Sequence, residues 1–576
     1  MSTLNQEFSR MLFELAELNE FNEDNPFRIR AFRRGAEIIE SLSQDVGTMD
    51  REELLKIPGI GKGLADMIEE FKAKGEIAEY KKLQSKFPEG LFQIMKVQGL
   101  GAKRTAVLFK SLHIDTLEKL AQAAREGKIA EIPGFGEKVQ ENILKSVSFV
   151  EKSAERILQS VALSSAEAIK EFLAENPVIQ KIEVAGSLRR WKETIGDLDF
   201  LCTSHNPEKA IAHFLSYPQK QRALAEGTTK ASLVLKSGLQ CDFRVVEAES
   251  FGAALLYFTG SKEHNVRLRE LALHEGFTLN EYGLFRLSDK KKTKPVAART
   301  EEEVYKRLGL PFIPPELRED RGEIEAGRKG KLPTLVTLKD ILGDFHNHTT
   351  LSDGKNTPEE MIQAAEDLGW KWYFCGDHSP ALNVALGLSA EALRKKLKTL
   401  QKLGEKFKKI KVFSGSEVDI LPDGKMDYPD PVLAELDVVV ASVHSRFKQS
   451  EEEMTARICR ALENPNVDIL GHISGRLINT RPGYTVNYET ILEKARVTQT
   501  AIEINGQPDR LELSDVHVKR AIELGVPLAL TTDAHSTHQL TNIDFALHVA
   551  RRGWAEAKNI LNTYAAAEIL KWLKNE

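Results

Sequence analysis

Cysteine is scarce in this sequence: its 576 residues contain only four. The four are far apart and form no C-x-x-C pair, which argues against a disulfide framework and against a zinc ribbon. Long apolar runs are also missing. No segment approaches the roughly 20 apolar residues of a membrane helix, and the start, MSTLNQEFSR, has no signal-peptide core. We therefore expect a cytoplasmic protein without a membrane partner, whose cysteines are reduced core residues: Cys202, Cys241, Cys375 and Cys459.

An excess of positive charge is missing as well. The net charge is −5, and residues 1–150 are nearly balanced, so bulk electrostatics do not predict a polyanionic partner. With 41% hydrophobic and 29% charged residues, the composition is that of a soluble globular protein. The chain is longer than one hydrophobic core normally supports, so we expect roughly three to five domains.

Three similar glycine turns punctuate the first 150 residues, which otherwise read as short amphipathic helices. In a helix-hairpin-helix turn, the glycines let backbone N–H groups approach a phosphate at the amino end of the second helix, without reading a base sequence. A single turn of this kind is as often an ordinary helix connection. Three repeats in one short region predict DNA binding. The glycines concerned are Gly59, Gly61, Gly99, Gly101, Gly134 and Gly136.

From about residue 180 the pattern changes to short runs of β-branched residues, which predicts a sheet. In the run Gly196-Asp-Leu-Asp-Phe200, the i, i+2 spacing puts Asp197 and Asp199 on the same strand face, and Asp242 supplies a third carboxylate from another strand. Three such groups can hold two divalent ions about 3.5–4 Å apart, as in-line phosphoryl transfer requires. A lone D-x-D pair is weak support for a catalytic metal site, so its context of neighbouring motifs decides whether this interpretation holds.

That context is a Gly-Ser turn followed by two arginines, Ala185-Gly-Ser-Leu-Arg-Arg190, and the segment Tyr257-Phe-Thr-Gly-Ser261. Together with the aspartates, these motifs resemble those of family X DNA polymerases, from residue 1 to about 315. The resemblance implies that Asp197, Asp199 and Asp242 are catalytic and bind Mg²⁺ or Mn²⁺. It further implies a dNTP pocket, to which we add Lys262 because its ammonium could grip a triphosphate: Gly186, Ser187, Arg190, Tyr257, Phe258, Gly260, Lys262 and Asn265.

Histidines gather in the last part of the chain, where nine of the 14 lie after residue 335. Most of them end a predicted strand, and predicted helices separate the strands. Ligands that emerge from successive strand ends converge at the carboxyl face of a parallel α/β barrel. A single histidine is more often a buried core residue, but the ordered set predicts a centre for up to three metal ions. Its members are His346, His348, Asp353, His378, Glu417, His444, His472, Asp533 and His535.

The order of these ligands resembles the PHP (polymerase and histidinol phosphatase) superfamily, over about residues 336–576. Imidazole and carboxylate ligands suit zinc, manganese or iron, and the residues do not choose among them; the resemblance favours Mn²⁺ or Zn²⁺. Where such a domain follows a family X polymerase, the resemblance implies a metal-dependent 3′→5′ exonuclease, with 3′-end processing or cleavage at abasic sites as alternatives.

We therefore predict a multi-domain enzyme that ends in a distorted TIM-like (β/α)7 barrel. Helical helix-hairpin-helix domains come first, followed by an α/β nucleotidyltransferase-type palm with a thumb. The predicted limits are 1–85 for the first helix-hairpin-helix domain, 86–153 for the fingers, 154–250 for the palm, 251–315 for the thumb, 316–335 for a linker and 336–576 for the PHP domain.

The expected function is gap filling in DNA repair, including base excision repair, by a monomer that binds gapped or primer-template DNA with a free 3′ end and dNTPs. The alternative is a DNA-end-binding scaffold whose PHP domain acts as a phosphatase on small phosphate esters. One activity of some family X members should be missing. Their 5′-deoxyribose-phosphate lyase needs a lysine nucleophile on the helix after the first glycine turn, and Met67 occupies that position here.

Overall fold

The computed structural model describes residues 4–22, 24–41, 46–47, 49–57, 59–74, 77–84, 87–88, 90–95, 100–137, 139–140, 143, 156–289, 291, 294–382, 385–479 and 483–573. The chain divides into two compact units. One unit holds residues 1–155 with the short segments 234–240 and 266–274, and the other holds the remainder. None of the described helices is both long and apolar enough to cross a membrane.

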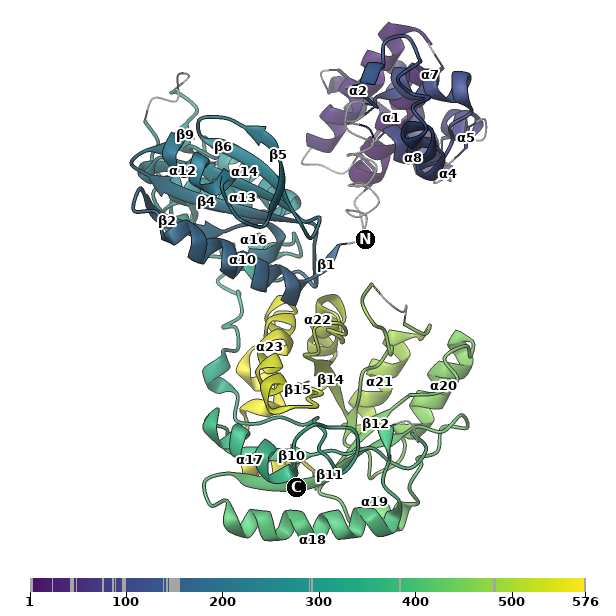
Figure 1. Ribbon diagram of the computed structural model, residues 1–576, viewed down its shortest axis with the longest axis vertical. Helices are drawn as coiled ribbons and strands as arrows, with labels where there is room; N and C mark the ends of the chain where they lie inside the picture. The colour runs from purple at the N-terminus through teal and green to yellow at the C-terminus, as the bar shows by residue number, and fades with distance from the viewer. Residues whose placement is uncertain are drawn as a thin grey trace. The chain divides into compact units, whose positions relative to one another are not determined.

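Residues 1–155 are helical where they are described (Figure 1, purple to dark blue). One core joins the first four helices through buried side chains such as Leu12, Ile39 and Ile68, and a second lies among the later helices around Leu108 and Leu120. Asp50 begins α3 with a capping box, since its carboxylate accepts from the Glu53 N–H. The helices are α1 (Leu4–Phe21), α2 (Pro26–Ser41), α3 (Arg51–Lys56), α4 (Lys62–Lys74), α5 (Ala78–Gln84), α6 (Gly90–Met95), α7 (Ala102–Leu112) and α8 (Leu117–Arg125).

A five-stranded sheet of order β2-β4-β7-β6-β5 forms the palm region. β2 and β4 are antiparallel, with Val184 opposite Phe200. In the first half of β4, the buried Leu198 and Phe200 alternate with Asp197 and Asp199, which lie on the other face. The elements are β1 (Ile157–Leu158), α10 (Gln159–Ala174), β2 (Ile179–Val184), α11 (Gly186–Arg189), β3 (Thr194–Ile195), β4 (Asp197–Ser204), α12 (Pro207–Leu215), β5 (Lys220–Glu226), β6 (Lys230–Leu235) and β7 (Gln240–Val245).

Helices and a small hairpin follow the sheet, and the chain then runs to the barrel through a partly helical segment. The predicted linker, 316–335, is folded: Glu316, Arg318 and Glu323 are buried in it. The elements are α13 (Phe251–Thr259), α14 (Lys262–His274), β8 (Phe277–Asn280), β9 (Gly283–Arg286), α15 (Glu301–Arg307), the 3-10 turn η2 (Pro315–Leu317) and α16 (Glu323–Arg328).

Six parallel strands of order β10-β11-β12-β13-β14-β15 form the carboxyl-terminal barrel (Figure 1, green to yellow). Most strand residues are apolar and buried, because helices cover the outer face of the sheet, although β11 and β14 also carry buried polar residues. They are β10 (Trp372–Cys375), β11 (Lys411–Asp419), β12 (Val438–Ser442), β13 (Ile469–Leu470), β14 (Ala501–Asn505) and β15 (Leu528–Thr531). The helices are α17 (Pro358–Asp367), α18 (Ala390–Lys406), α19 (Asp430–Leu433), α20 (Glu451–Ala461), α21 (Tyr488–Thr498), α22 (Asp515–Leu524), α23 (Ile543–Arg552) and α24 (Ala566–Leu573).

An extended segment around residues 342–348 takes the seventh place in the barrel. Asn347 pairs in parallel with Ala534, just beyond β15, and the His348 N–H donates to the Ala534 carbonyl at 2.7 Å. On the other side, the Gly376 N–H donates to the Asn347 carbonyl at 3.1 Å. The segment therefore bridges the two outer strands and closes a distorted barrel, which agrees with the predicted fold class.

Candidate active sites

The three palm aspartates lie on neighbouring strands. Asp197 and Asp199 open β4, and Asp242 lies on β7, the next strand of the sheet. Burial raises the pKa of Asp199 to about 7, and the negative charges of Asp197 and Asp242 add to the rise. Burial and Asp242 also raise the pKa of Asp197. Three carboxylates on adjacent strands form a site of concentrated negative charge, which suits divalent cations.

A glycine is required where the Gly-Ser turn meets these aspartates. Gly186 begins α11 with φ +61°, a conformation that residues with a Cβ rarely adopt. A Cβ at this position would lie 2.2 Å from Asp199 Oδ2. The Ala185 N–H also donates to the Asp199 carbonyl at 2.8 Å, so the Gly-Ser turn and β4 are fixed to each other.

The segment from Tyr257 to Asn265 lies against Arg190. Arg190 donates to the Thr259 carbonyl, and a Cβ on Gly260 would lie 3.1 Å from Arg190 Nη1. The Tyr257 and Phe258 rings meet edge to face, and the Asn265 amide donates to the Tyr257 carbonyl at 2.7 Å. Lys262 is exposed at the start of α14. The structure thus brings the predicted nucleotide-pocket residues into one region.

A buried ion network behind this pocket was not predicted from the sequence. Glu301 accepts from Arg189 Nη2 at 2.6 Å and from Arg318 Nη1 at 2.6 Å. Burial alone would raise the pKa of Glu301, but the two arginines outweigh it and hold the pKa at about 2. Arg189 also donates to the Thr259 hydroxyl at 2.6 Å, so the network supports the segment that carries Tyr257. Glu301 is 112 residues from Arg189 and 17 residues from Arg318, and no spacing rule links the three.

The glycine turns present open backbone at helix starts. Gly61 directly precedes α4 and Gly101 directly precedes α7. Among the described residues, a Cβ on Gly61, Gly101, Gly134 or Gly136 would meet no atom within 4 Å, so there is open space on the Cβ side of each of these glycines. Gly59, at φ +102°, packs instead against Ile38. Gly99 lies outside the described residues.

The predicted metal ligands of the barrel converge at the carboxyl ends of its strands. Eight of the nine fall into three groups, in each of which one ligand atom per residue lies within 4.8 Å of the others. The groups share His348 and His378, so they form one continuous centre. They are His348, Asp353, His378 and His535; His346, His348 and Asp533; and His378, Glu417 and His444.

Glu417 is the hub of this centre. Its carboxylate lies 2.8 Å from His378 Nδ1, 3.3 Å from His346 Nε2 and 3.4 Å from His444 Nε2. His472, the ninth predicted ligand, belongs to none of the three groups, and its Nε2 is 2.9 Å from Glu417 Oε1. A buried carboxylate shared by four imidazoles is suited to bridge metal ions.

Unpaired imidazole nitrogens show that the residues fit a metal centre. His346 Nε2, His378 Nδ1, His444 Nδ1 and both ring nitrogens of His348 are buried and make no hydrogen bond. Buried polar atoms are almost always paired, so such a concentration requires an explanation. His378 Nδ1 is close to Glu417 without hydrogen-bond geometry, as expected when two ligands point at a common ion. Burial also lowers the pKa of His348 to about 4, which keeps its imidazole neutral, the form that binds metals.

Residues behind the ligands orient them, and the sequence interpretation missed these. Glu503 Oε1 lies 2.6 Å from His346 Nδ1, which directs Nε2 toward the centre. Asp344 accepts from the Thr532 N–H and hydroxyl at 3.0 and 2.6 Å, and so ties the ligand segment to the end of β15. An acidic residue inside an apolar strand, Ala-Ile-Glu-Ile-Asn505, was a signal that could have identified Glu503.

One cation also reaches the centre. Arg510 follows β14, and its Nε lies 3.4 Å from Asp533 Oδ2. Its Nη1 is buried without a hydrogen-bond partner. A guanidinium beside a group of metal ligands can bind an anionic substrate such as a phosphodiester.

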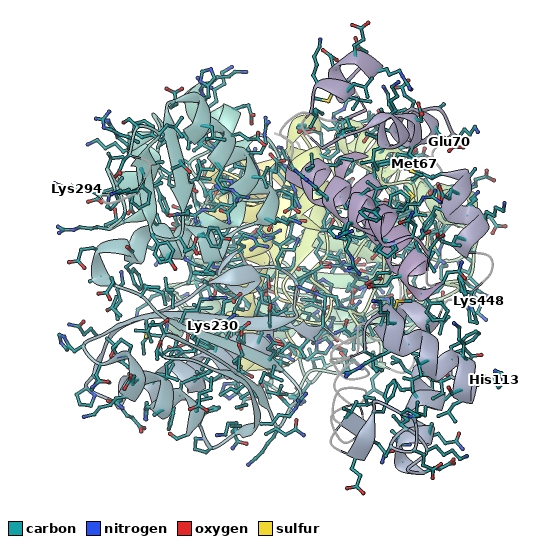
Figure 2. All side chains as sticks on the ribbon, turned by 90° about the horizontal axis from the view of Figure 1, so that it is seen from above. Met67, Glu70, His113, Lys230, Lys294 and Lys448 are labelled. Atoms are coloured by element: carbon teal, nitrogen blue, oxygen red, sulfur yellow. The ribbon has the colours of Figure 1, made fainter. Side chains whose placement is uncertain are left out.

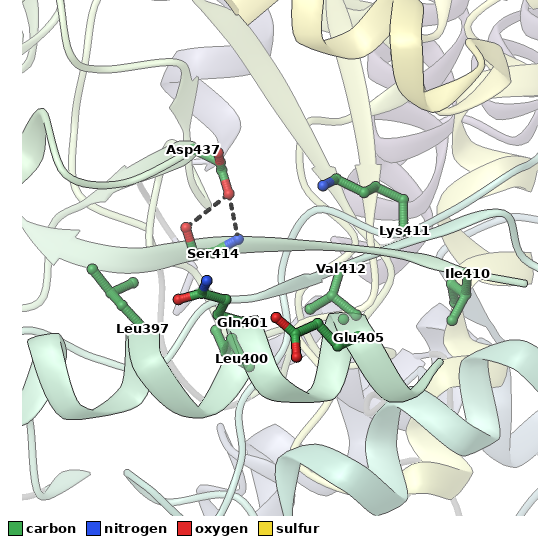
Figure 3. A pocket seen from close by; sticks show the side chains of 10 residues that line it. Leu397, Leu400, Gln401, Glu405, Ile410, Lys411, Val412, Ser414 and Asp437 are labelled. Carbon is green, nitrogen blue, oxygen red and sulfur yellow. Dashed lines mark hydrogen bonds between the residues drawn. The ribbon is translucent and has the colours of Figure 1, made fainter. Parts of the chain in front are cut away.

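A separate pocket of 390 Å³ lies between α18 and β11 (Figure 3). Apolar residues such as Leu400 and Val412 line it together with Gln401, Lys411 and Asp437. The Asp437 carboxylate accepts from the Ser414 N–H and hydroxyl, both at 2.8 Å. No candidate metal ligand lines this pocket.

Comparison with known proteins identifies the family. Family models match for a helix-hairpin-helix domain at residues 3–77, a SAM-like helix-hairpin-helix tandem at 93–147, the DNA polymerase beta thumb at 254–319 and a PHP domain at 344–507. The DNA polymerase/3′-5′ exonuclease PolX of Bacillus subtilis (strain 168) is 39% identical over 568 residues, which cover 98% of both chains. The chain belongs to the PolX family of DNA polymerase/3′-5′ exonucleases.

This membership confirms the predicted family, fold class and enzyme class. Other relatives are shorter. A probable phosphatase of Thermoanaerobacter sp. (strain X514) is 30% identical over 245 residues, which are 40% of this chain and 94% of the relative. A probable phosphatase of Clostridium botulinum (strain Hall) is 29% identical over 244 residues.

Proposed function

We propose that this protein fills gaps during DNA repair with its palm site and trims 3′ ends with its barrel site. The observation that carries the proposal is that one chain contains two separate groups of candidate metal ligands. Asp197, Asp199 and Asp242 form one, and the ligands around Glu417 form the other. No residue belongs to both, so each activity should be removable alone.

In the palm, the three aspartates would hold Mg²⁺ or Mn²⁺, which supplies charge neutralisation for phosphoryl transfer. The Gly186-Ser187 turn and Arg190 would bind the triphosphate of a dNTP, since Arg190 Nη2 has no hydrogen-bond partner among the described residues. The segment from Tyr257 to Asn265 would contact the sugar and base. Tyr257 is exposed, and Arg190 donates to the carbonyl of Thr259 two residues further along the same segment, which supports this placement.

In the barrel, the three ligand groups would hold up to three ions, Mn²⁺ or Zn²⁺, which supply Lewis-acid chemistry for phosphodiester cleavage. Arg510 would bind a phosphate oxygen with its unpaired Nη1. Glu503 would keep His346 oriented throughout. The glycine turns of the helical unit would hold the DNA backbone through open N–H groups.

The test compares primer extension with 3′-end degradation on gapped DNA, with Mg²⁺, Mn²⁺ and Zn²⁺ varied. Asp199→Ala should abolish extension and leave degradation within about two-fold. His535→Ala should do the reverse, because losing a metal ligand costs several kcal/mol of transition-state stabilisation. His538→Ala is the matched control, since His538 is exposed three residues away and belongs to no ligand group.

Loss of both activities in a folded Asp199→Ala protein would refute the two-site proposal. Release of phosphate from small esters without degradation of DNA would instead favour the phosphatase alternative, which the probable phosphatases among the relatives suggest. We also propose a monomer that works in the cytoplasm, and light scattering at micromolar concentration tests the monomer.

A further inference from the structure

Arg552, the last residue of α23 in the barrel, reaches the polymerase pocket. It is 3% exposed, and its guanidinium forks between acceptors on two sides. Nη1 donates to the backbone carbonyl of Arg190 and, at 3.0 Å, to Glu319 Oε1. Nη2 donates to Asp515 Oδ2 at 2.6 Å.

The same Glu319 oxygen holds the side chain of Arg190. Arg190 Nε donates to Glu319 Oε1 at 3.0 Å, and Nη1 donates to the Thr259 carbonyl. Burial would raise the pKa of Glu319, but Arg552, Arg190 and Lys192 outweigh it and lower the pKa. Glu319 is therefore a charged acceptor that both arginines share. Arg190 is held at its carbonyl, its Nε and its Nη1, and Arg552 donates directly to two of the acceptors involved, the Arg190 carbonyl and Glu319.

We propose that Arg552 is a positioning residue of the polymerase site, through which the barrel completes the dNTP pocket. The inference rests on the proposed role of Arg190 in triphosphate binding. With Nε and Nη1 occupied, the guanidinium of Arg190 is oriented so that Nη2 is left for the nucleotide. Arg552 acts through Arg190 and touches neither nucleotide nor metal.

The chemistry at this position requires an arginine. Three acceptors lie in two directions: the Arg190 carbonyl and Glu319 on one side, and Asp515 on the other. A planar guanidinium donates to the acceptors on both sides with separate nitrogens, whereas a lysine has a single nitrogen and cannot reach both sides at once. Asp515 is itself fixed by Arg321 Nη2 at 3.1 Å, so the far side of the fork is anchored.

A second arginine of the barrel provides a matched comparison. Arg476 Nη2 donates to Glu193 of the palm at 2.6 Å, so it also joins barrel and palm. Its remaining contacts are the Arg510 and Leu511 carbonyls within the barrel. Arg476 has no described contact with Arg190 or Glu319. Loss of either arginine removes a buried or half-buried link between the same two regions, but only Arg552 supports the pocket.

The test measures KM and kcat for dNTP addition on gapped DNA by the full-length chain. Arg552→Ala should raise the KM for dNTP about ten-fold and change kcat less, because Arg190 would lose charge-assisted hydrogen bonds that hold it while the groups at the reacting atoms stay in place. Arg552→Lys should give an intermediate KM. Arg476→Ala should leave the KM within about two-fold, and Arg552→Ala should keep 3′-end degradation, which reports that the barrel remains folded.

A wild-type KM in both Arg552→Ala and Arg552→Lys overturns the inference. An equal rise in KM for Arg476→Ala also overturns it, because general docking of the barrel would then explain the effect. Arg190→Ala separates this inference from the proposed function. If Arg190→Ala leaves the KM unchanged, the assumed role of Arg190 is wrong; if Arg190→Ala raises it and both Arg552 variants do not, only the role of Arg552 is wrong.

Discussion

A buried lysine under the metal centre offers a sharp test of how the barrel is stabilised. Lys396 lies on α18 and is 2% exposed. Its ammonium lies 2.9 Å from Asp377 Oδ2 and donates to the carbonyls of Cys375 and Gly415 at 2.8 and 2.9 Å. Asp377 in turn accepts from the Thr349 N–H at 2.8 Å, and so positions the loop that follows the extended segment with His346 and His348.

Lys396→Met keeps the length of the side chain and removes its charge. Asp377 would remain ionised and buried without its cation, and two carbonyls would lose their donor. Breaking one side of a buried ion pair costs about 3–5 kcal/mol. For a domain of this size, each kcal/mol shifts Tm by about 2–4 °C, so we expect a decrease of about 10 °C.

The loss of stability caused by Lys396→Met should grow as pH rises. Burial would raise the pKa of Asp377, but Lys396 outweighs it and holds the pKa well below the usual value. In the wild type, this stabilisation is present above the unfolded pKa of about 4 and is lost as pH falls through the lower folded value. In the variant, the uncompensated carboxylate should have a raised pKa, so stability is lost as pH rises above about 4. The difference between the two proteins should therefore be larger at pH 8 than at pH 5.

Thermal unfolding followed by tryptophan fluorescence measures the Tm of the barrel, because four of the five tryptophans lie in it: Trp370, Trp372, Trp554 and Trp572. Lys398→Met is the matched control, since Lys398 is exposed two residues along the same helix. It should change stability by less than about 0.5 kcal/mol. A Tm for Lys396→Met within 2 °C of the wild type at pH 8 would refute the reasoning.

Three further predictions concern single positions. Gly186→Ala should reduce nucleotide addition at least about 100-fold and spare 3′-end degradation, because its Cβ would lie 2.2 Å from Asp199 Oδ2; equal extension rates would contradict this. Burial raises the pKa of Asp468 to about 8, so its contribution to stability is lost between about pH 4 and pH 8. Asp468→Asn should therefore raise Tm more at pH 9 than at pH 5, as calorimetry would show. Met67, on α4 (Figure 2), cannot form an imine, so borohydride should trap no efficient covalent complex on a pre-incised abasic substrate; a trapped lysine within residues 1–85 would contradict the prediction.

Local patterns were sufficient to identify the candidate catalytic and metal-binding residues. The strand-end histidines and the D-x-D pair are recognisable because a strand presents alternate residues on one face and parallel strands end at one edge. Eight of the nine predicted barrel ligands lie in the three groups, as that geometry requires. One of the seven strand places of the predicted barrel is taken by the extended segment around residues 342–348, which bonds to Ala534 on one side and to Gly376 on the other.

Only the tertiary structure showed what holds these residues in place. Glu503 orients His346 from 157 positions away, and Arg552 reaches the Arg190 carbonyl across 362. The segment 316–335, whose prolines and charges predict a connection, instead buries Arg318 and holds the partly buried Glu319 in ion networks. The sequence does not show which residue a charged side chain will pair with, because pairing depends on which elements lie close together in the folded chain. The sequence by itself therefore determined which residues form the two candidate sites, and the fold determined the hydrogen bonds and ion pairs that hold those residues in place.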